Sequence, residues 1–182
     1  MNLSHIEATV SEYDVAIIGA GPAGSAAGYF LATGGLRVVL LDKFDFPRDK
    51  ICGDGLTPRA IKILAKIGIL PQLEKTAFHC SELKIRYSDE LTFNLGLENL
   101  ENLPNYILTM PRLQLDHALL QHAINAGAKF FPKAKVESIS RDFDKHIHLE
   151  IESGRRIECA LAIVATGANT RLLQNLGLSK KT

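Results

Sequence analysis

The sequence predicts an α/β fold, in which a parallel sheet carries helices on its faces and a small antiparallel meander is attached to it. A fully apolar run over residues 15–18 ends in a glycine-rich turn, and an uncharged segment with helical character follows. A second strand-like run over residues 37–41 ends at Asp42. This strand–helix–strand order is typical of a parallel sheet. After residue 134, apolar and polar residues alternate, as they do in antiparallel strands with one wet face.

The glycines of the turn are spaced as a phosphate-binding turn requires. Gly19 permits the tight turn, Gly21 removes a side chain that would hold a pyrophosphate away from the backbone, and Gly24 lets the helix pack closely. The helix start then faces the pyrophosphate with unpaired N–H groups. Asp42 lies about 20 residues further on, where its carboxylate can accept a hydrogen bond from a ribose 2′-OH. These features predict a Rossmann-like unit for NAD or FAD rather than NADP. A glycine-rich turn of some other α/β domain is the alternative.

The remaining elements follow from periodicity and from helix start and stop signals. Thr57 and Pro58 have the N-cap and N1 pattern, and the helix that they open ends at Gly68. We further predict helices over 22–33 and 112–126, strands over 82–87, 91–95 and 128–131, and a loop over 96–105.

The segment 134–164 predicts an antiparallel meander that ends in an apolar strand, residues 160–165, returning to the buried sheet. His146 and His148 share one face of a strand. Because no third ligand is near in sequence, we interpret them as a solvent-facing pair and predict no metal site.

Composition limits the class of protein. The chain has 182 residues, enough for one domain or slightly more, and a formal net charge of +1, which indicates neither a nucleic-acid nor a membrane-surface partner. Three cysteines without a CxxC motif favour a reduced, cytoplasmic chain. Residues 15–36 are uncharged, but their glycines and proline fit the strand–turn–helix better than a transmembrane segment. Residues 1–12 are expected to form a flexible arm rather than a signal peptide.

Four stretches together resemble the N-terminal half of the geranylgeranyl reductase family. This family belongs to a wider group of FAD enzymes that includes p-hydroxybenzoate hydroxylase and the flavin halogenases. The stretches are the glycine turn with Asp42 and residues 47–59, 110–119 and 165–170. The most specific is the Arg48-x-Lys50-x-Cys52-Gly53 loop, and the resemblance covers residues 13–178.

The resemblance implies FAD as the cofactor, with NAD(P)H as a candidate electron donor. It places Asp42 at the adenosine ribose, Val136 at the adenine through its backbone, and Arg112 at the cofactor from the start of its helix. The implied pyrophosphate residues are Gly19, Gly21, Ala23 and Gly24, and those at the ribityl and isoalloxazine end are Arg48, Cys52, Gly53 and Gly55. No catalytic residue is implied.

Other interpretations of four of these residues remain open. Arg48 and Lys50 could lie in a solvated charged loop. Arg112 could pair with Asp116 at i,i+4, and Cys52 could be a small buried apolar residue rather than a nucleophile.

The resemblance also shows departures. Thr166-Gly167 stands where the family has Asp-Gly, the later family segments that complete the flavin site do not occur, and the chain has no Trp. We therefore expect residues 13–182 to form the FAD-binding domain, with residues 80–110 beginning a substrate domain. A truncated product, a fragment, or a subunit completed by a second polypeptide would each explain the length.

The expected function is flavin-mediated reduction of prenyl C=C bonds in a small-molecule or prenyl-lipid substrate. A flavin monooxygenase or halogenase half, and a non-catalytic fragment, are the alternatives.

Overall fold

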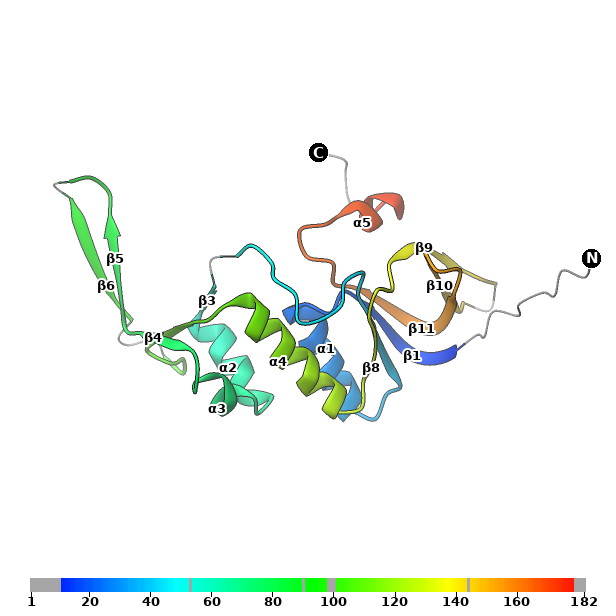
Figure 1. Cartoon of the computed structure of the whole chain (residues 1–182), viewed down its shortest axis with the longest axis horizontal. Helices are drawn as coiled ribbons and strands as arrows, with labels where there is room; N and C mark the ends of the chain where they lie inside the picture. Colours follow the sequence, from blue (N-terminus) through cyan, green and yellow to red (C-terminus); the bar gives the residue numbers. More distant parts are fainter. Residues whose placement is uncertain (1–10, 53, 90, 98–100, 144, 179–182) are drawn as a thin grey trace, which may run out of the picture. The chain divides into compact units, whose positions relative to one another are not determined.

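The computed structural model describes residues 11–52, 54–89, 91–97, 101–143 and 145–178 (Figure 1). The chain divides into two compact units. The first comprises Met1–Arg48 and Leu119–Thr182, and the second comprises Asp49–Ala118. The first strand begins at Ser11, inside the predicted arm, and the rest of that arm lies outside the described residues.

The first unit is built on a six-stranded mixed sheet with the order β8-β2-β1-β11-β10-β9. Strands β8, β2, β1 and β11 run parallel, and β10 and β9 continue the sheet in antiparallel fashion. The strands are β1 Ser11–Ile18, β2 Val38–Leu41, β8 Lys129–Phe131, β9 Val136–Arg141, β10 Ile147–Ile151 and β11 Arg156–Val164. This arrangement confirms the predicted α/β class and the return of the final apolar strand to the parallel sheet.

Each face of this sheet packs against a different layer. Val15 and Ile17 lie in a cluster with residues of helix α1 (Pro22–Thr33) and with Leu120 from the C-terminal part of helix α4 (Arg112–Asn125). Ala16 and Ile18 lie in a second cluster with the meander strands and with helix α5 (Arg171–Asn175). Because successive side chains of a strand point to opposite faces, the continuous apolar run of β1 supplies both layers.

The second unit has its own small core of helices α2 (Pro58–Lys66) and α3 (Leu70–Leu73) with a three-stranded sheet. Thr57 Oγ1 accepts the Ala60 N–H at 3.4 Å, which confirms the predicted N-cap. The sheet has the order β3-β7-β4, formed by Gly55–Leu56, Ile107–Thr109 and Phe78–Cys80. Among the helices that the structure describes in either unit, none has both the length and the apolar character needed to cross a bilayer.

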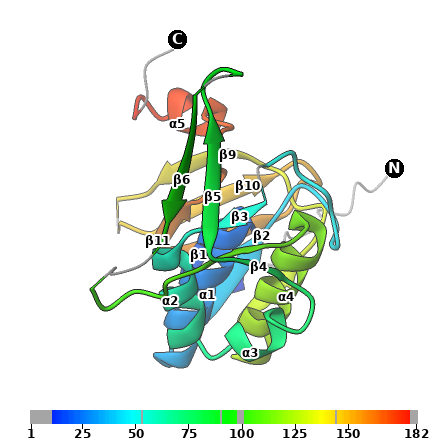
Figure 2. The same cartoon turned by 90° about the vertical axis from the view of Figure 1, so that its left-hand side faces the viewer.

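A two-stranded ribbon completes the second unit (Figure 2). It is formed by β5 (Glu82–Arg86) and β6 (Thr92–Gly96), close to the predicted strands, with Ile85 opposite Phe93. Ile85, Phe93 and the following Tyr87 are all exposed. By the alternation of a strand, Lys84 and Arg86 lie on the other face, so the ribbon has one apolar and one polar face.

Candidate cofactor site

The turn between β1 and α1 contains the three glycines that the sequence analysis assigned to phosphate binding. At two of them, the protein's own packing leaves no room for a side chain. Gly19 has φ +106°, and a Cβ there would lie 2.4 Å from the Ala165 carbonyl oxygen. A Cβ on Gly24 would lie 1.8 Å from the Gly19 carbonyl oxygen. Both residues are therefore required for the chain to fold around the turn.

Gly21 is different, because nothing in the protein's own packing excludes a side chain there. Its backbone is extended, with φ −72° and ψ −173°, which any residue can adopt. Among the described residues, the one atom within 4 Å of a built Cβ is Arg48 Nη2, at 3.5 Å. Gly21 is the N-cap of α1, where the described chain provides no side-chain cap for the first-turn N–H groups. Gly21 and the uncapped N-terminus of α1 thus form an open backbone surface, which we call the ledge. This ledge fits the pyrophosphate of a dinucleotide.

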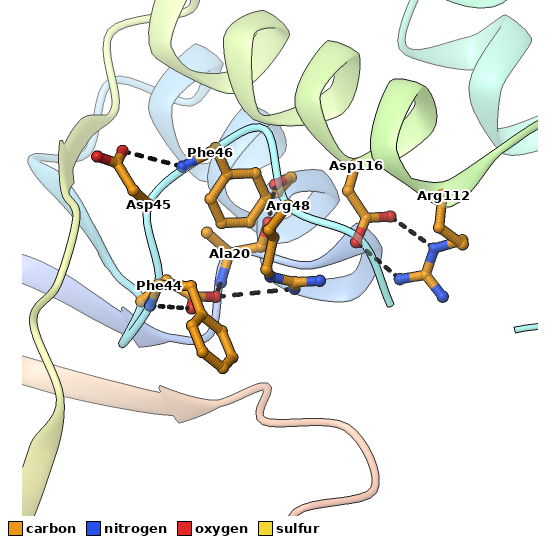
Figure 3. Close-up of polar contacts among 9 residues, drawn as sticks. Ala20, Phe44, Asp45, Phe46, Arg48, Arg112 and Asp116 are labelled. Atoms are coloured by element: carbon orange, nitrogen blue, oxygen red, sulfur yellow. Dashed lines mark hydrogen bonds and ion pairs between the residues drawn. The ribbon is translucent and has the colours of Figure 1, made fainter. Parts of the chain in front are cut away.

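Asp42 ties the end of β2 to the glycine turn. Its Oδ2 accepts the Ala20 N–H at 2.9 Å, and its Oδ1 accepts the Phe44 N–H at 3.0 Å (Figure 3). The Asp42 carbonyl also accepts the Ala134 N–H at 2.8 Å. A carboxylate has about four lone-pair sites, so two remain for ribose hydroxyls. Val136 begins β9 two residues after Ala134, and its backbone contact with the adenine stays a prediction.

Arg48 lies against this carboxylate rather than in solvent. Its side chain is only 14% exposed, and its Nη2 is 3.9 Å from Asp42 Oδ2. The guanidinium also lies 4.8 Å from the centre of the Phe46 ring (Figure 3). The solvated-loop interpretation is therefore wrong for Arg48, whereas Lys50 is exposed. Over Gly21, Arg48 offers a positive charge and a planar donor fork to an anionic group.

Ser25 is a further residue of the turn, which the sequence analysis did not single out. It is fully buried, and its Oγ donates to the Ala20 carbonyl at 2.9 Å. A single serine near the start of a mostly apolar helix segment is the sequence feature that could have indicated this buried hydrogen bond.

The predicted residues of the second unit form a separate group. Arg112 makes a bidentate ion pair with the fully buried Asp116, with Nε–Oδ1 at 2.7 Å and Nη2–Oδ2 at 2.8 Å (Figure 3). This is the i,i+4 pair that the sequence left open. Asp116 raises the pKa of Arg112 above its ordinary value, and a hydrogen bond with Cys52 adds to the effect.

Two neighbouring predictions can be placed more precisely. Cys52 is exposed, so the interpretation of a buried apolar cysteine is wrong. Gly55 pairs with Thr109 in the β3–β7 ladder. Gly53 lies outside the described residues, and Ala23 lies exposed in the first turn of α1. Contact of Cys52, Gly53 and Gly55 with the ribityl and isoalloxazine end of FAD, and of Ala23 with its pyrophosphate, stays a prediction.

The histidines of the meander differ from expectation. His148 is buried, and its Nε2 lies 2.8 Å from Asp142 Oδ2, while its Nδ1 lies 3.8 Å from Glu158 Oε2. The predicted solvent-facing pair is therefore wrong for His148, because two carboxylates cover its ring; His146 is half exposed. No group of three or more potential ligands among the described residues is arranged to hold a metal ion.

Comparison with known proteins identifies the family. The profile of the FAD binding domain family matches residues 12–182. The chain belongs to this family. Its cofactor is accordingly FAD, and the glycine turn, Asp42 and Arg48 are the part of the first unit that fits the group.

Two curated relatives and one solved structure show how much of such a protein the chain represents. The menaquinone reductase of Mycolicibacterium smegmatis is 37% identical over 168 residues, covering 90% of this chain and 40% of the relative. Digeranylgeranylglycerophospholipid reductase 1 of Methanosphaera stadtmanae is 31% identical over 172 residues, covering 93% and 41%. A flavoprotein/dehydrogenase from Cytophaga hutchinsonii superposes with a TM-score of 0.83 at 26% identity, covering 94% and 43%. The chain thus spans about 40% of the length of the curated relatives that it matches.

Proposed function

We propose that this chain is the FAD-binding part of a flavin-dependent reductase that acts on prenyl C=C bonds of an isoprenoid lipid. The open ledge over Gly21, with Arg48 above it and Asp42 beside it, is the observation that carries the binding part of the proposal. When bound and reduced, FAD supplies the hydride for such a reduction.

The residues of the first unit bind and orient the cofactor in this proposal. The N-terminus of α1 and the Arg48 guanidinium neutralise the pyrophosphate, the first through its dipole and the second through a charged fork. The buried Asp42 carboxylate, fixed by two backbone N–H donors, accepts the ribose hydroxyls without having to reorganise. Arg112, which forms its bidentate ion pair with Asp116 in the second unit, is not used in this binding argument.

The substrate class is supported by the two relatives. One reduces menaquinone and the other a digeranylgeranyl phospholipid, by their names. Digeranylgeranyl groups are prenyl chains, and menaquinone carries a prenyl side chain. We therefore place a prenyl chain, rather than an aromatic acid, as the group that the complete enzyme reduces.

The test has two stages. The purified chain is first incubated with FAD and desalted, and the visible flavin bands that remain with the protein are measured. The loaded protein is then reduced with dithionite without oxygen and mixed with a geranylgeranyl lipid, and flavin reoxidation is followed together with the mass of the lipid. Reoxidation with a gain of one H2 per double bond supports the reductase.

Other outcomes decide against it. A chain that is folded by circular dichroism but retains no flavin contradicts the binding part. A loaded chain whose flavin reoxidises only with oxygen, with an aromatic substrate hydroxylated or halogenated, contradicts the reductase in favour of the monooxygenase or halogenase alternative. NADH and NADPH are compared as donors in place of dithionite.

A further inference from the structure

Helix α2 of the second unit (Figure 2) has two faces of different chemistry. On one face, Ile61 and Leu64 are buried in the core of the unit. On the other face, the side chains of Arg59, Lys62 and Lys66 are exposed. Because residues three and four apart lie on the same side of a helix, these basic side chains form one row along the outer face of α2.

The charge of this row is not balanced within its own segment. Residues 55–73 contain no Asp and no Glu. Among the residues that the structure describes, no carboxylate pairs with Arg59 or Lys62. Arg59 stands in the first turn of α2, where the helix dipole favours negative charge. Helix stability therefore does not explain the two positive charges, and a partner outside the chain does.

An apolar side chain lies within the same row. Ile63 is 45% exposed and follows Arg59 by four residues, which puts it on the outer face beside the basic groups. An aliphatic residue among basic ones is typical of helices that lie in the interface of an anionic bilayer, where the two kinds of side chain meet acyl chains and phosphates. A nucleic-acid backbone would match the charges but would leave Ile63 without an apolar environment.

We propose that the outer face of α2, formed by Arg59, Lys62 and Ile63, docks on the surface of an anionic phospholipid bilayer. The two basic groups contact lipid phosphates, and Ile63 enters the boundary between headgroups and acyl chains. The formal net charge of +1 does not reveal this face, because acidic residues elsewhere in the chain offset it. The inference goes beyond the proposed function and does not depend on it, since docking needs no turnover.

The test measures co-sedimentation of the purified 182-residue chain with lipid vesicles. Vesicles of phosphatidylcholine are compared with vesicles that also contain anionic phosphatidylglycerol. We expect binding to the anionic vesicles alone, and we expect it to disappear near 1 M salt, where the Debye length is about 3 Å. Replacing both Arg59→Glu and Lys62→Glu should weaken binding at least about 25-fold, because each basic residue at such a surface contributes about fivefold. Ile63→Ser should weaken it about fivefold, because roughly half of this side chain is left to bury.

The chain offers a matched control for the double charge reversal. Lys84→Glu with Arg86→Glu makes the same change of charge in the same unit, at two exposed residues on the polar face of the β5–β6 ribbon. The α2 variant should fold, because Arg59→Glu places a negative charge at the helix N-terminus, where the dipole favours it.

Each outcome is decisive once circular dichroism shows the variants to be folded. Loss of vesicle binding in the α2 variants, but not in the ribbon control, supports the proposal. No binding by the wild type, equal binding to neutral and anionic vesicles, or equal losses in the α2 and ribbon variants overturns it. Binding of a labelled DNA duplex in place of vesicles, with the same dependence on Arg59 and Lys62, overturns it in favour of a nucleic-acid partner. Flavin retention is measured on the same samples, so failure here is distinguishable from failure of the proposed function.

Discussion

Replacing Gly21 and Gly24 separately by alanine tests whether the ledge is open for a ligand. The two glycines lie three residues apart in one turn, yet their surroundings differ. A Cβ at position 21 meets only the flexible end of Arg48 at 3.5 Å, an ordinary contact. A Cβ at position 24 meets the Gly19 carbonyl oxygen at 1.8 Å, which no real structure tolerates.

Gly21→Ala is expected to change the free energy of unfolding very little but to weaken FAD binding strongly. Gly21→Ala gains about 0.4–1 kcal/mol from the restricted unfolded chain and loses a similar amount, about 1 kcal/mol, because alanine is a poorer N-cap than glycine. Its free energy of unfolding should stay near that of the wild type. Its methyl group displaces the pyrophosphate from the turn, and each lost charge-assisted hydrogen bond is worth about 1.5–3 kcal/mol. That corresponds to FAD binding weakened about 10- to 100-fold.

Gly24→Ala should instead unfold the domain or lower its free energy of unfolding substantially. Overpacking a core usually costs about 1–3 kcal/mol, and we expect a loss near the upper end of this range. Urea denaturation followed by circular dichroism measures the stability of both variants, and quenching of FAD fluorescence measures binding. If Gly21→Ala bound FAD as tightly as the wild type, the pyrophosphate would not lie on this ledge. If Gly21→Ala unfolded the chain, the packing argument would be wrong.

Three further predictions follow from ion pairs. Arg48→Ala should weaken FAD binding about 10-fold or more through the loss of a charge-assisted contact, whereas Arg37→Ala, which breaks an exposed pair in the same unit, should leave fluorescence titrations unchanged. Asp116→Ala should cost about 3–5 kcal/mol in urea unfolding because it leaves a charged partner unpaired; a loss below 1 kcal/mol would contradict the buried pair. The hydrogen bond with His148 lowers the pKa of Asp142 in the folded state. The ionised Asp142 therefore stabilises the fold at pH values above the pKa of this group in the unfolded chain. This stabilisation is lost as the pH falls through its lower pKa in the folded chain. Thermal melts of Asp142→Asn and the wild type should therefore differ at neutral pH and converge in acid, and a constant difference would contradict the assignment.

The sequence predicts the first unit well because its signals are local. The βαβ unit has an uninterrupted apolar strand, glycines at fixed offsets and Pro22 at the helix start, so helix α1 has the predicted bounds. The return of β11 to the parallel sheet follows from its apolar composition in the same way.

The missed features depend on contacts between distant residues. Strands β3, β4 and β7 have only two or three residues each, and pairs such as Leu56 with Leu108 cannot be inferred from periodicity. The burial of His148 depends on Glu158 of the next strand and on the turn residue Asp142. Alternation alone assigned that face to solvent, because it cannot show that acidic side chains cover a polar one.

The apolar face of the β5–β6 ribbon is a surface whose exposure can be measured with a fluorescent dye. A two-stranded ribbon is at best marginally stable in water without something against its apolar side, and Ile85, Tyr87 and Phe93 present their surfaces to solvent on one side. Environment-sensitive dyes such as anilinonaphthalene sulfonate become fluorescent on such surfaces. Their displacement would give a label-free signal for anything that covers the ribbon, and the same surface will make the purified chain adhere to hydrophobic resins and detergent micelles.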